Sequence, residues 1–211
     1  LVALAARSEA SGLRVPELVF AELDEAFGRT EGDEEIQDLL RASQGLNIGQ
    51  HFLPGALTFD PVVTNVDADL ASRIVWLDAF LTNIDRTVRN TNLLMWRKEL
   101  WLIDHGSCLY FHHSWSNWER HATGPFEPIK DHVLLPQATR LIEADAYCRS
   151  RLSSETLRAI VATIPDDWLR WDDAEGTPDE LRAIYERFLI MRLDRSAAFT
   201  IVAQDARQAL V

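Results

Sequence analysis

The most regular pattern of apolar and polar positions follows Asp67. Apolar side chains recur there at spacings of four, three, four and three residues, which predicts a helix with one buried face. The residues in this stripe are Leu70, Ile74, Leu77, Leu81 and Ile84. Asp67 suits the N-cap, because a carboxylate there can accept from the first unpaired backbone N–H groups. The stripe ends in a polar run, Asn83–Asn92, with no helical period.

Two short β-like segments follow this polar run. Residues Asn92–Trp96 and Leu100–Ile103 are mostly apolar, and the charged residues Arg97–Glu99 between them predict a turn. We therefore expect a small hairpin with a polar loop on each side. Trp96 and Trp101 should pack against each other across its strands.

Elsewhere the pattern predicts short strands toward the N-terminus and helices toward the C-terminus. The expected strands are Arg14–Leu23 and Gln50–Leu53, the second inside a connector rich in Gly and Pro that spans Gly45–Pro61. The expected helices are Leu1–Ser11, Glu34–Ala42, Leu134–Arg151, Glu155–Ile164 and a final helix opened by the capping box Thr177–Glu180. Together these elements predict an α+β protein.

Composition narrows the classes of function. The 211 residues include 21 Lys and Arg against 33 Asp and Glu, and the net charge of −12 argues against nucleic-acid binding by this chain alone. Two cysteines are too few for a disulfide scaffold or a Cys-rich zinc module. No apolar run is long enough to span a membrane and no signal peptide is recognisable, so we expect a cytoplasmic protein.

The candidate chemistry is concentrated around the hairpin. Asp85 and Asn90 lie in the polar run, and Asp104 directly follows the second apolar segment. Phosphoryl transfer from ATP needs one carboxylate to orient or deprotonate the acceptor hydroxyl. It also needs an amide oxygen and a second carboxylate to hold Mg²⁺ on the phosphates. Asn92 is a rival to Asn90 for the amide role.

These residues resemble a known family. The pattern Asn83-x-Asp85-Arg86-x-x-x-Asn90, followed by Leu102–Gly106, resembles the HipA-like kinases, which are related to the phosphatidylinositol 3-/4-kinase-like fold. Further similar segments are Glu35–Leu40, Phe52–Ala56, Arg73–Phe80 and Leu109–His113. The resemblance implies a protein-kinase-like α+β fold with a mostly helical C-terminal lobe and a hairpin that carries the site. Residues 1–55 would be a remnant of the N-terminal lobe with the hinge, and residues 56–211 the C-terminal lobe.

The resemblance also implies roles for particular residues. Asp85 would be the catalytic residue, and Asn90 and Asp104 would bind Mg²⁺. The hinge would meet the adenine of ATP through Gln50, His51, Phe52 and Leu53. The expected acceptor is a Ser or Thr hydroxyl on a protein, and an antitoxin-like protein is a candidate partner.

Two departures from the family pattern keep other functions open. No phosphate-binding loop with a strand lysine precedes the first helix, since the only lysines are Lys98 and Lys130, and Thr87 stands where the family often has His. Either the N-terminal strands lie upstream of Leu1, which the absence of an initial Met favours, or the chain is a nucleotide-binding pseudokinase that acts through protein binding. A kinase with a small-molecule acceptor is the third interpretation.

Other polar residues near the motif have weaker interpretations. Arg86 and Arg89 are candidates for contacts with phosphate or a substrate acid, and a surface salt bridge is at least as well supported for each. His105, His112 and His113, together with Asp104, are a candidate zinc site, but they lack the helical spacing of such sites, and polar packing is the favoured interpretation.

Overall fold

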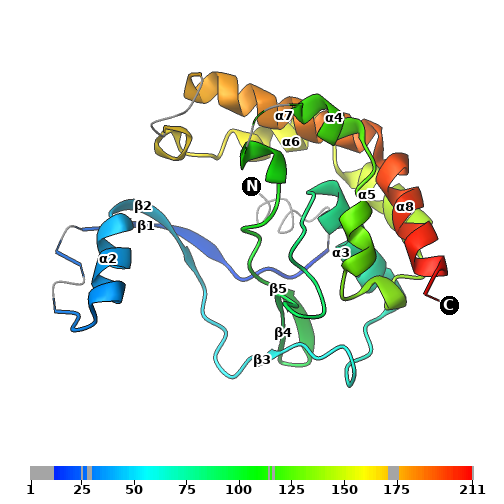
Figure 1. Ribbon diagram of the computed structural model, residues 1–211, viewed down its shortest axis with the longest axis horizontal. Coiled ribbons are helices and arrows are strands. Elements are labelled where there is room, and N and C mark those ends of the chain that lie inside the picture. Colours follow the sequence, from blue (N-terminus) through cyan, green and yellow to red (C-terminus); the bar gives the residue numbers. More distant parts are fainter. Residues whose placement is uncertain are drawn as a thin grey trace. The chain divides into compact units, whose positions relative to one another are not determined.

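The computed structural model describes residues 12–24, 26–27, 30–113, 115, 117–170 and 176–210, so the predicted helix at Leu1–Ser11 lies outside the described residues. Among the described residues, Pro16–Pro54 form one compact unit, here the small unit, and the rest form a second, the large unit. Helices and small antiparallel sheets make this an α+β protein (Figure 1).

The small unit is a β-hairpin with one helix. Strand β1 (Leu18–Leu23) pairs antiparallel with β2 (Gly45–Gln50), and α2 (Glu34–Ala42) lies between them in sequence. Asp33 caps α2 by accepting from the N–H groups of Glu35 and Ile36. The helix therefore has the bounds that the sequence predicts.

The strands of the small unit differ from the prediction. Strand β1 begins only at Leu18, and the predicted strand Gln50–Leu53 is wrong, because β2 lies before it and ends at Gln50. Glycines at both ends of β2 read as breakers in the sequence. In the sheet, however, a Cβ on Gly49 would come within 3.0 Å of the Val19 side chain, so the pairing itself favours glycine there.

The large unit contains a three-stranded antiparallel sheet in the order β3–β4–β5. Its strands are Leu57–Thr58, Leu93–Trp96 and Glu99–Leu102. The predicted hairpin is β4–β5, and Arg97 and Lys98 form its two-residue turn with φ of 52° and 68°. The rings of Trp96 and Trp101 meet edge to face with centroids 5.3 Å apart, which confirms the predicted packing. Strand β3 was not foreseen.

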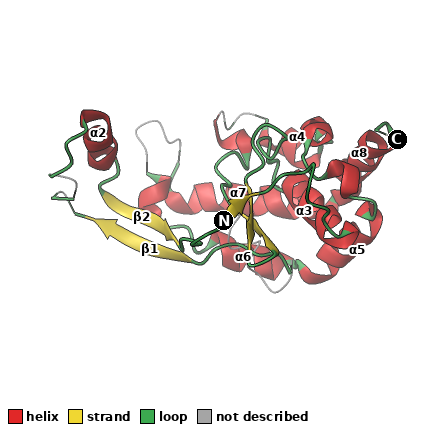
Figure 2. Ribbon diagram, turned by 90° about the horizontal axis from the view of Figure 1, so that it is seen from below, coloured by secondary structure: helices red, strands yellow, loops and turns green. Residues whose placement is uncertain are grey.

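Helix α3 (Ala68–Phe80) lies in the core of the large unit, capped by Asp67 as predicted. It packs against α5 (Leu141–Arg151) and α8 (Ser196–Gln208), and these three helices lie side by side (Figures 1 and 2). Ala71, Ser72 and every residue from 74 to 80 are buried. The helix is therefore buried on nearly every side, and not along the single face that the sequence predicts. Ile84 lies beyond the helix and is 41% exposed, so its place in the stripe is wrong.

The remaining helices complete the large unit. They are the 3₁₀ turns η1 (Tyr110–His113), η2 (Glu127–Asp131), η3 (Leu135–Gln137) and η4 (Asp166–Leu169), and the α-helices α4 (Trp118–Thr123), α6 (Ser154–Val161) and α7 (Pro178–Asp194). The capping box at Thr177 and Glu180 is present as predicted. The helix predicted from Leu134 begins instead at Leu141, and α8 was not foreseen. Within the described part of the chain, every helix is too short or too polar to cross a lipid bilayer.

Candidate active site

The site begins where α3 ends. The N–H of Asn83 donates to the carbonyl of Asp78 at 2.8 Å, and the N–H of Thr82 donates to that of Ala79 at 3.3 Å, which is the Schellman pattern. Thr82 occupies the left-handed position of this motif with φ of 53°. A β-branched residue is strained there, so the surrounding core holds an abrupt turn that carries the chain from α3 into the polar loop.

Short-range hydrogen bonds fix the loop that holds Asp85. The side chain of Asn83 donates from Nδ2 to Oδ1 of Asp78 at 2.9 Å and accepts with Oδ1 from the N–H of Asp85 at 3.1 Å. The N–H of Thr87 then donates to the carbonyls of both Asp85 and Asn90 at 2.9 Å. The loop therefore closes on itself and places Asp85 and Asn90 side by side.

The carboxylate of Asp85 accepts hydrogen bonds from two asparagines of the loop. Its Oδ2 accepts from Nδ2 of Asn90 at 2.7 Å and from Nδ2 of Asn92 at 3.2 Å. The structure thus brings Asp85 together with both asparagines that the sequence singled out. Because the side-chain nitrogen of each asparagine donates to Asp85, the side-chain oxygen of each asparagine is the atom that can bind a cation.

The hairpin places Ile103, the residue before Asp104, against Asn92. The N–H of Ile103 donates to the carbonyl of Asn92 at 3.1 Å, which extends the β4–β5 ladder by one pair. Asp104 is the next residue, with φ of 45°, and its Oδ1 accepts from the N–H of Gly106 at 3.1 Å. Asn90, Asn92 and Ile103 line a groove of about 640 Å³ that also includes residues 58–62.

A buried polar cluster lies beneath the loop. Oδ2 of Asp78 accepts from Nε of Arg86 at 2.6 Å and lies 2.9 Å from Nε2 of His132. Burial alone would raise the pKa of Asp78, but the charge of Arg86 and the hydrogen bond from His132 outweigh it and hold that pKa well below its usual range. Asp78 is therefore a carboxylate that anchors the loop from below.

His132 enters this cluster as a neutral imidazole. The N–H of Leu134 donates to its Nδ1 at 3.0 Å, so Nε2 carries the proton that is donated to Asp78. Burial lowers the pKa of His132, in agreement with that geometry. Neither Asp78 nor His132 is among the site residues predicted from the sequence. A lone carboxylate inside the apolar run Trp76–Phe80 was the signal for Asp78, because a buried charge must be paired.

Arg86 is not the surface residue that the sequence suggested. It is only 1% exposed and pairs with the buried Asp78, so the surface salt bridge and the contact with phosphate are both wrong for it. Arg89, by contrast, is exposed at the groove next to Asn90 and stays a candidate for contact with an anion.

The predicted hinge lies in the small unit. Gln50 is the last residue of β2, and the N–H of His51 donates to the carbonyl of Glu17 at 2.7 Å. Phe52 is 80% exposed, whereas Leu53 is buried. Contact of Gln50–Leu53 with adenine stays a prediction.

The donors around Asp85 suit Mg²⁺ better than zinc. Carboxylate and amide oxygens are the hard ligands that Mg²⁺ takes, usually one or two from the protein with the rest from phosphate and water. No three His, Cys, Asp or Glu side chains of the described residues form a cluster that could hold a metal ion. His105 is largely buried, and burial together with the nearby charge of Arg86 lowers its pKa to about 4.

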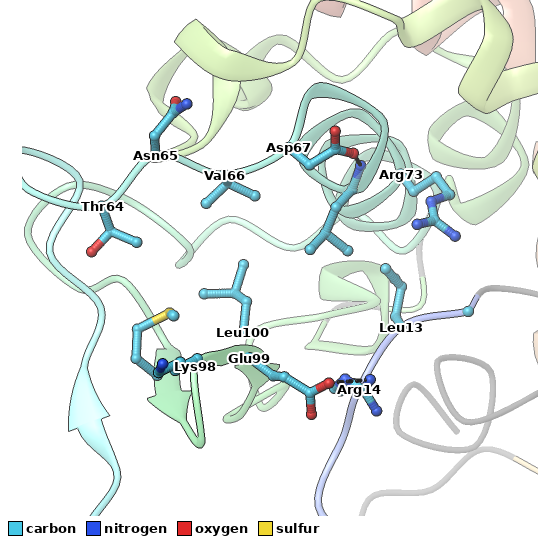
Figure 3. Close-up of a pocket in the computed structure, with 13 residues that line it drawn as sticks. Leu13, Arg14, Thr64, Asn65, Val66, Asp67, Arg73, Lys98, Glu99 and Leu100 are labelled. Carbon is cyan, nitrogen blue, oxygen red and sulfur yellow. Dashed lines mark hydrogen bonds and ion pairs between the residues drawn. The ribbon is translucent and has the colours of Figure 1, made fainter.

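A second cavity of about 610 Å³ lies elsewhere in the large unit (Figure 3). Its rim carries the ion pair between Arg14 and Glu99, with Lys98 and Arg73 also on the lining, and Leu13 and Leu100 contribute apolar surface. None of the predicted site residues lines this cavity, so it is separate from the groove beside Asp85.

A family model matches most of this sequence. The sequence model of the family described as HipA-like kinase matches residues 3–196. Neither a curated protein nor a solved structure shows significant similarity to this sequence. The match includes Asp85, both asparagines and Asp104.

Proposed function

The chain belongs to the HipA-like kinase family, and from that premise we propose that it transfers the γ-phosphoryl group of ATP to a Ser or Thr hydroxyl on a protein. The observation that carries this proposal is the grouping at Asp85. One carboxylate oxygen accepts from Asn90 and Asn92, and Asp104 lies one residue beyond the backbone pair of Asn92 and Ile103.

The chemistry assigned to Asp85 is that of a base. It orients the acceptor hydroxyl and accepts its proton. The acceptor oxygen bonds to the γ-phosphorus while the bond from that phosphorus to the β–γ bridging oxygen breaks, and ADP leaves with the electron pair. The amides of Asn90 and Asn92 hold Asp85 in place for this step, since both donate to the oxygen that they share.

Mg²⁺ would neutralise the charge of the phosphates in this reaction. We assign its protein ligands to Asp104 and to an asparagine of the loop. Asn90 has the spacing of the family motif, and Asn92 is its rival. The hard oxygen donors of these side chains support the assignment.

The small unit takes the place of the N-terminal lobe in this proposal. Residues 1–55 are assigned to the remnant of that lobe, with Gln50–Leu53 as the hinge that meets adenine, and residues 56–211 to the C-terminal lobe. The separate compactness of Pro16–Pro54 supports a boundary near residue 55, whereas residues 12–15 group with the large unit and not with the small unit. An antitoxin-like protein is kept as a candidate partner on the strength of the family alone.

The test of this proposal compares wild type with Asp85→Asn. Each protein is incubated with γ-labelled ATP, Mg²⁺ and a library of Ser- and Thr-containing peptides, and binding of a fluorescent ATP analogue is measured in parallel. We expect Asp85→Asn to abolish transfer while binding stays largely intact, because the amide fills the same space but cannot accept the proton. Asp131→Asn, at an exposed aspartate outside the groove, is the matched control and should keep both activities.

One observation favours a second function. The chain has only Lys98 and Lys130, and both lie in the large unit, so no lysine of the small unit can meet the phosphates. Wild type that binds Mg·ATP but labels no acceptor would indicate a nucleotide-binding module that acts through protein binding. Labelling of a small alcohol but of no peptide would indicate a small-molecule kinase. Unchanged transfer by Asp85→Asn would refute the role given to Asp85.

A further inference from the structure

Arg86, the residue directly after Asp85, connects three segments of the large unit. Its Nε donates to Oδ2 of Asp78 in α3 at 2.6 Å. Its Nη1 donates to the carbonyl of Asn92 and to the carbonyl of Ile103, the latter at 3.4 Å. A single planar group thus joins helix α3, the end of the polar loop and the end of β5.

The two carbonyls define where the hairpin becomes the site. The N–H of Ile103 already donates to the carbonyl of Asn92 at 3.1 Å, and Nη1 of Arg86 lies at this last rung of the ladder. Ile103 immediately precedes Asp104, and Asp85 immediately precedes Arg86. The guanidinium therefore contacts the carbonyl of the residue before Asp104, and the main chain of the same arginine directly follows Asp85.

Asp78, the carboxylate that binds Arg86, accepts hydrogen bonds at both of its oxygens. Oδ1 of Asp78 accepts from Nδ2 of Asn83 at 2.9 Å, and Oδ2 is shared by Arg86 and His132. The carbonyl of Arg86 accepts from the N–H of Val133 at 3.0 Å, so the segment that carries His132 also holds the Arg86 backbone. Neither the backbone nor the guanidinium can shift without breaking several of these bonds.

Stability alone is a poor reason for this arrangement. Burial of an ion pair costs desolvation energy that its attraction barely repays, and apolar replacements of the same volume often stabilise a core. Nη2 of Arg86 is buried and has no hydrogen-bond partner among the described residues, which adds to that cost. The planar guanidinium fixes three acceptors relative to one another. A residue without this fork of donors, such as lysine, cannot do so.

We propose that Arg86 is a positioning residue that sets the separation between Asp85 and Asp104 and thereby the Mg²⁺ requirement of nucleotide binding. This inference rests on the proposed function, because it takes Asp104 as a metal ligand. Removal of outer partners of metal ligands typically weakens metal binding by about 10- to 100-fold.

The test uses Arg86→Lys in the full chain. A lysine ammonium can meet Asp78, but it cannot also hold the two carbonyls in the fork geometry. The readout is anisotropy of a fluorescent ATP analogue during a Mg²⁺ titration, at a temperature well below the unfolding transition of each variant. We expect the Mg²⁺ concentration at half-maximal binding to rise about tenfold in Arg86→Lys.

A matched control separates positioning from loss of stability. Arg192 is also buried and also donates to main-chain carbonyls, those of Ala79, Phe80 and His121, but it touches neither Asn92 nor Ile103. Arg192→Lys should therefore lower the unfolding temperature and leave the Mg²⁺ midpoint unchanged. An equal rise of the midpoint in both variants would overturn the inference, as would an unchanged midpoint in Arg86→Lys.

Two further measurements keep the outcomes distinct. If wild type shows no Mg²⁺-dependent binding, the proposed function fails before the inference is reached. If Arg86→Lys does not fold, Asp78→Asn takes its place, since it keeps an oxygen for the guanidinium while it removes the charge that anchors it. We expect a smaller rise of the Mg²⁺ midpoint in that variant, and no rise would refute the positioning role.

Discussion

Nε2 of His132 lies 2.9 Å from Oδ2 of Asp78 and donates its proton to that buried carboxylate. The opposite ring nitrogen accepts from the N–H of Leu134, so the native state holds His132 neutral. The unfolded chain has no such constraint, and its histidines bind a proton below about pH 6.5. The difference between the two states makes the stability of the large unit depend on pH.

The sign of this dependence follows from the lowered pKa of His132 in the native state. As the pH falls below about 6.5, the unfolded state takes up a proton that the native state refuses, so the free energy of unfolding falls by up to about 1.4 kcal/mol per pH unit. His105, with its pKa lowered to about 4, adds a contribution of the same sign. The lowered pKa of Asp78 gives a contribution of the same sign in a lower pH range: it stabilises the fold above about pH 4 and is lost only in stronger acid.

We therefore expect His132→Gln to be less stable than wild type at pH 7.5 but to lose less stability between pH 6.5 and pH 5. Urea denaturation followed by tryptophan fluorescence measures this in the large unit, because all seven tryptophans lie in its part of the chain. His51→Gln, at an exposed histidine of the small unit, is the control and should keep the wild-type slope. Parallel slopes for wild type and His132→Gln would contradict a neutral His132 in the native state.

Arg192 gives a prediction about stability. Its guanidinium donates to the carbonyls of Ala79 and Phe80, the last residues of α3, at 2.6 and 2.8 Å, and to that of His121 at 2.8 Å. A cation at a helix C-terminus is also attracted by the partial negative charge at that end of the helix dipole. Burial lowers the pKa of Arg192 to about 10, so it stays charged at neutral pH.

Replacement by methionine keeps much of the volume of Arg192 but removes every donor. We expect Arg192→Met to lower the free energy of unfolding by about 2–4 kcal/mol, because buried carbonyls lose charged partners. Arg170→Met is the control, since Arg170 pairs with exposed aspartates three and four positions away, and such pairs contribute about 1 kcal/mol or less. Equal losses in the two variants would show that the buried carbonyls do not depend on Arg192.

How far the sequence predicted this protein depended on the range of the interactions. The bounds of α2, the caps at Asp67 and Thr177 and the β4–β5 hairpin follow from local patterns, and all of them are present. Strand β2 and the burial of α3 on nearly every face were missed, because both depend on partners far away in the sequence.

The same distinction applies to the site. Asp85, Asn90 and Asn92 lie within eight residues of one another, so their spacing was visible in the sequence, and the structure places their side chains together. The pairing of Asp78 with His132 joins residues 54 positions apart, and no local pattern reveals it. Arg86 was visible in the motif, but only the fold shows that it faces the core.

The last prediction concerns the choice between Asn90 and Asn92 as the metal ligand. Asn90 has the spacing of the family motif and is exposed on the groove. Asn92 is buried, and its main chain pairs with Ile103, the residue before Asp104. Because the carbonyl of Asn92 is also held by Arg86, its position relative to Asp104 is the more tightly fixed of the two.

A rigid spacing matters because Mg²⁺ demands near-ideal octahedral geometry and tolerates little displacement of its ligands. We therefore expect Asn92→Ala to raise the Mg²⁺ midpoint of nucleotide binding about tenfold or more, and Asn90→Ala to raise it less. Asn90→Ala should instead act mainly on transfer, because it frees the carboxylate of Asp85 from its closer partner, at 2.7 Å. The two variants are compared by the Mg²⁺ titration and by the peptide-labelling rate, and a larger midpoint shift in Asn90→Ala would assign the metal to Asn90.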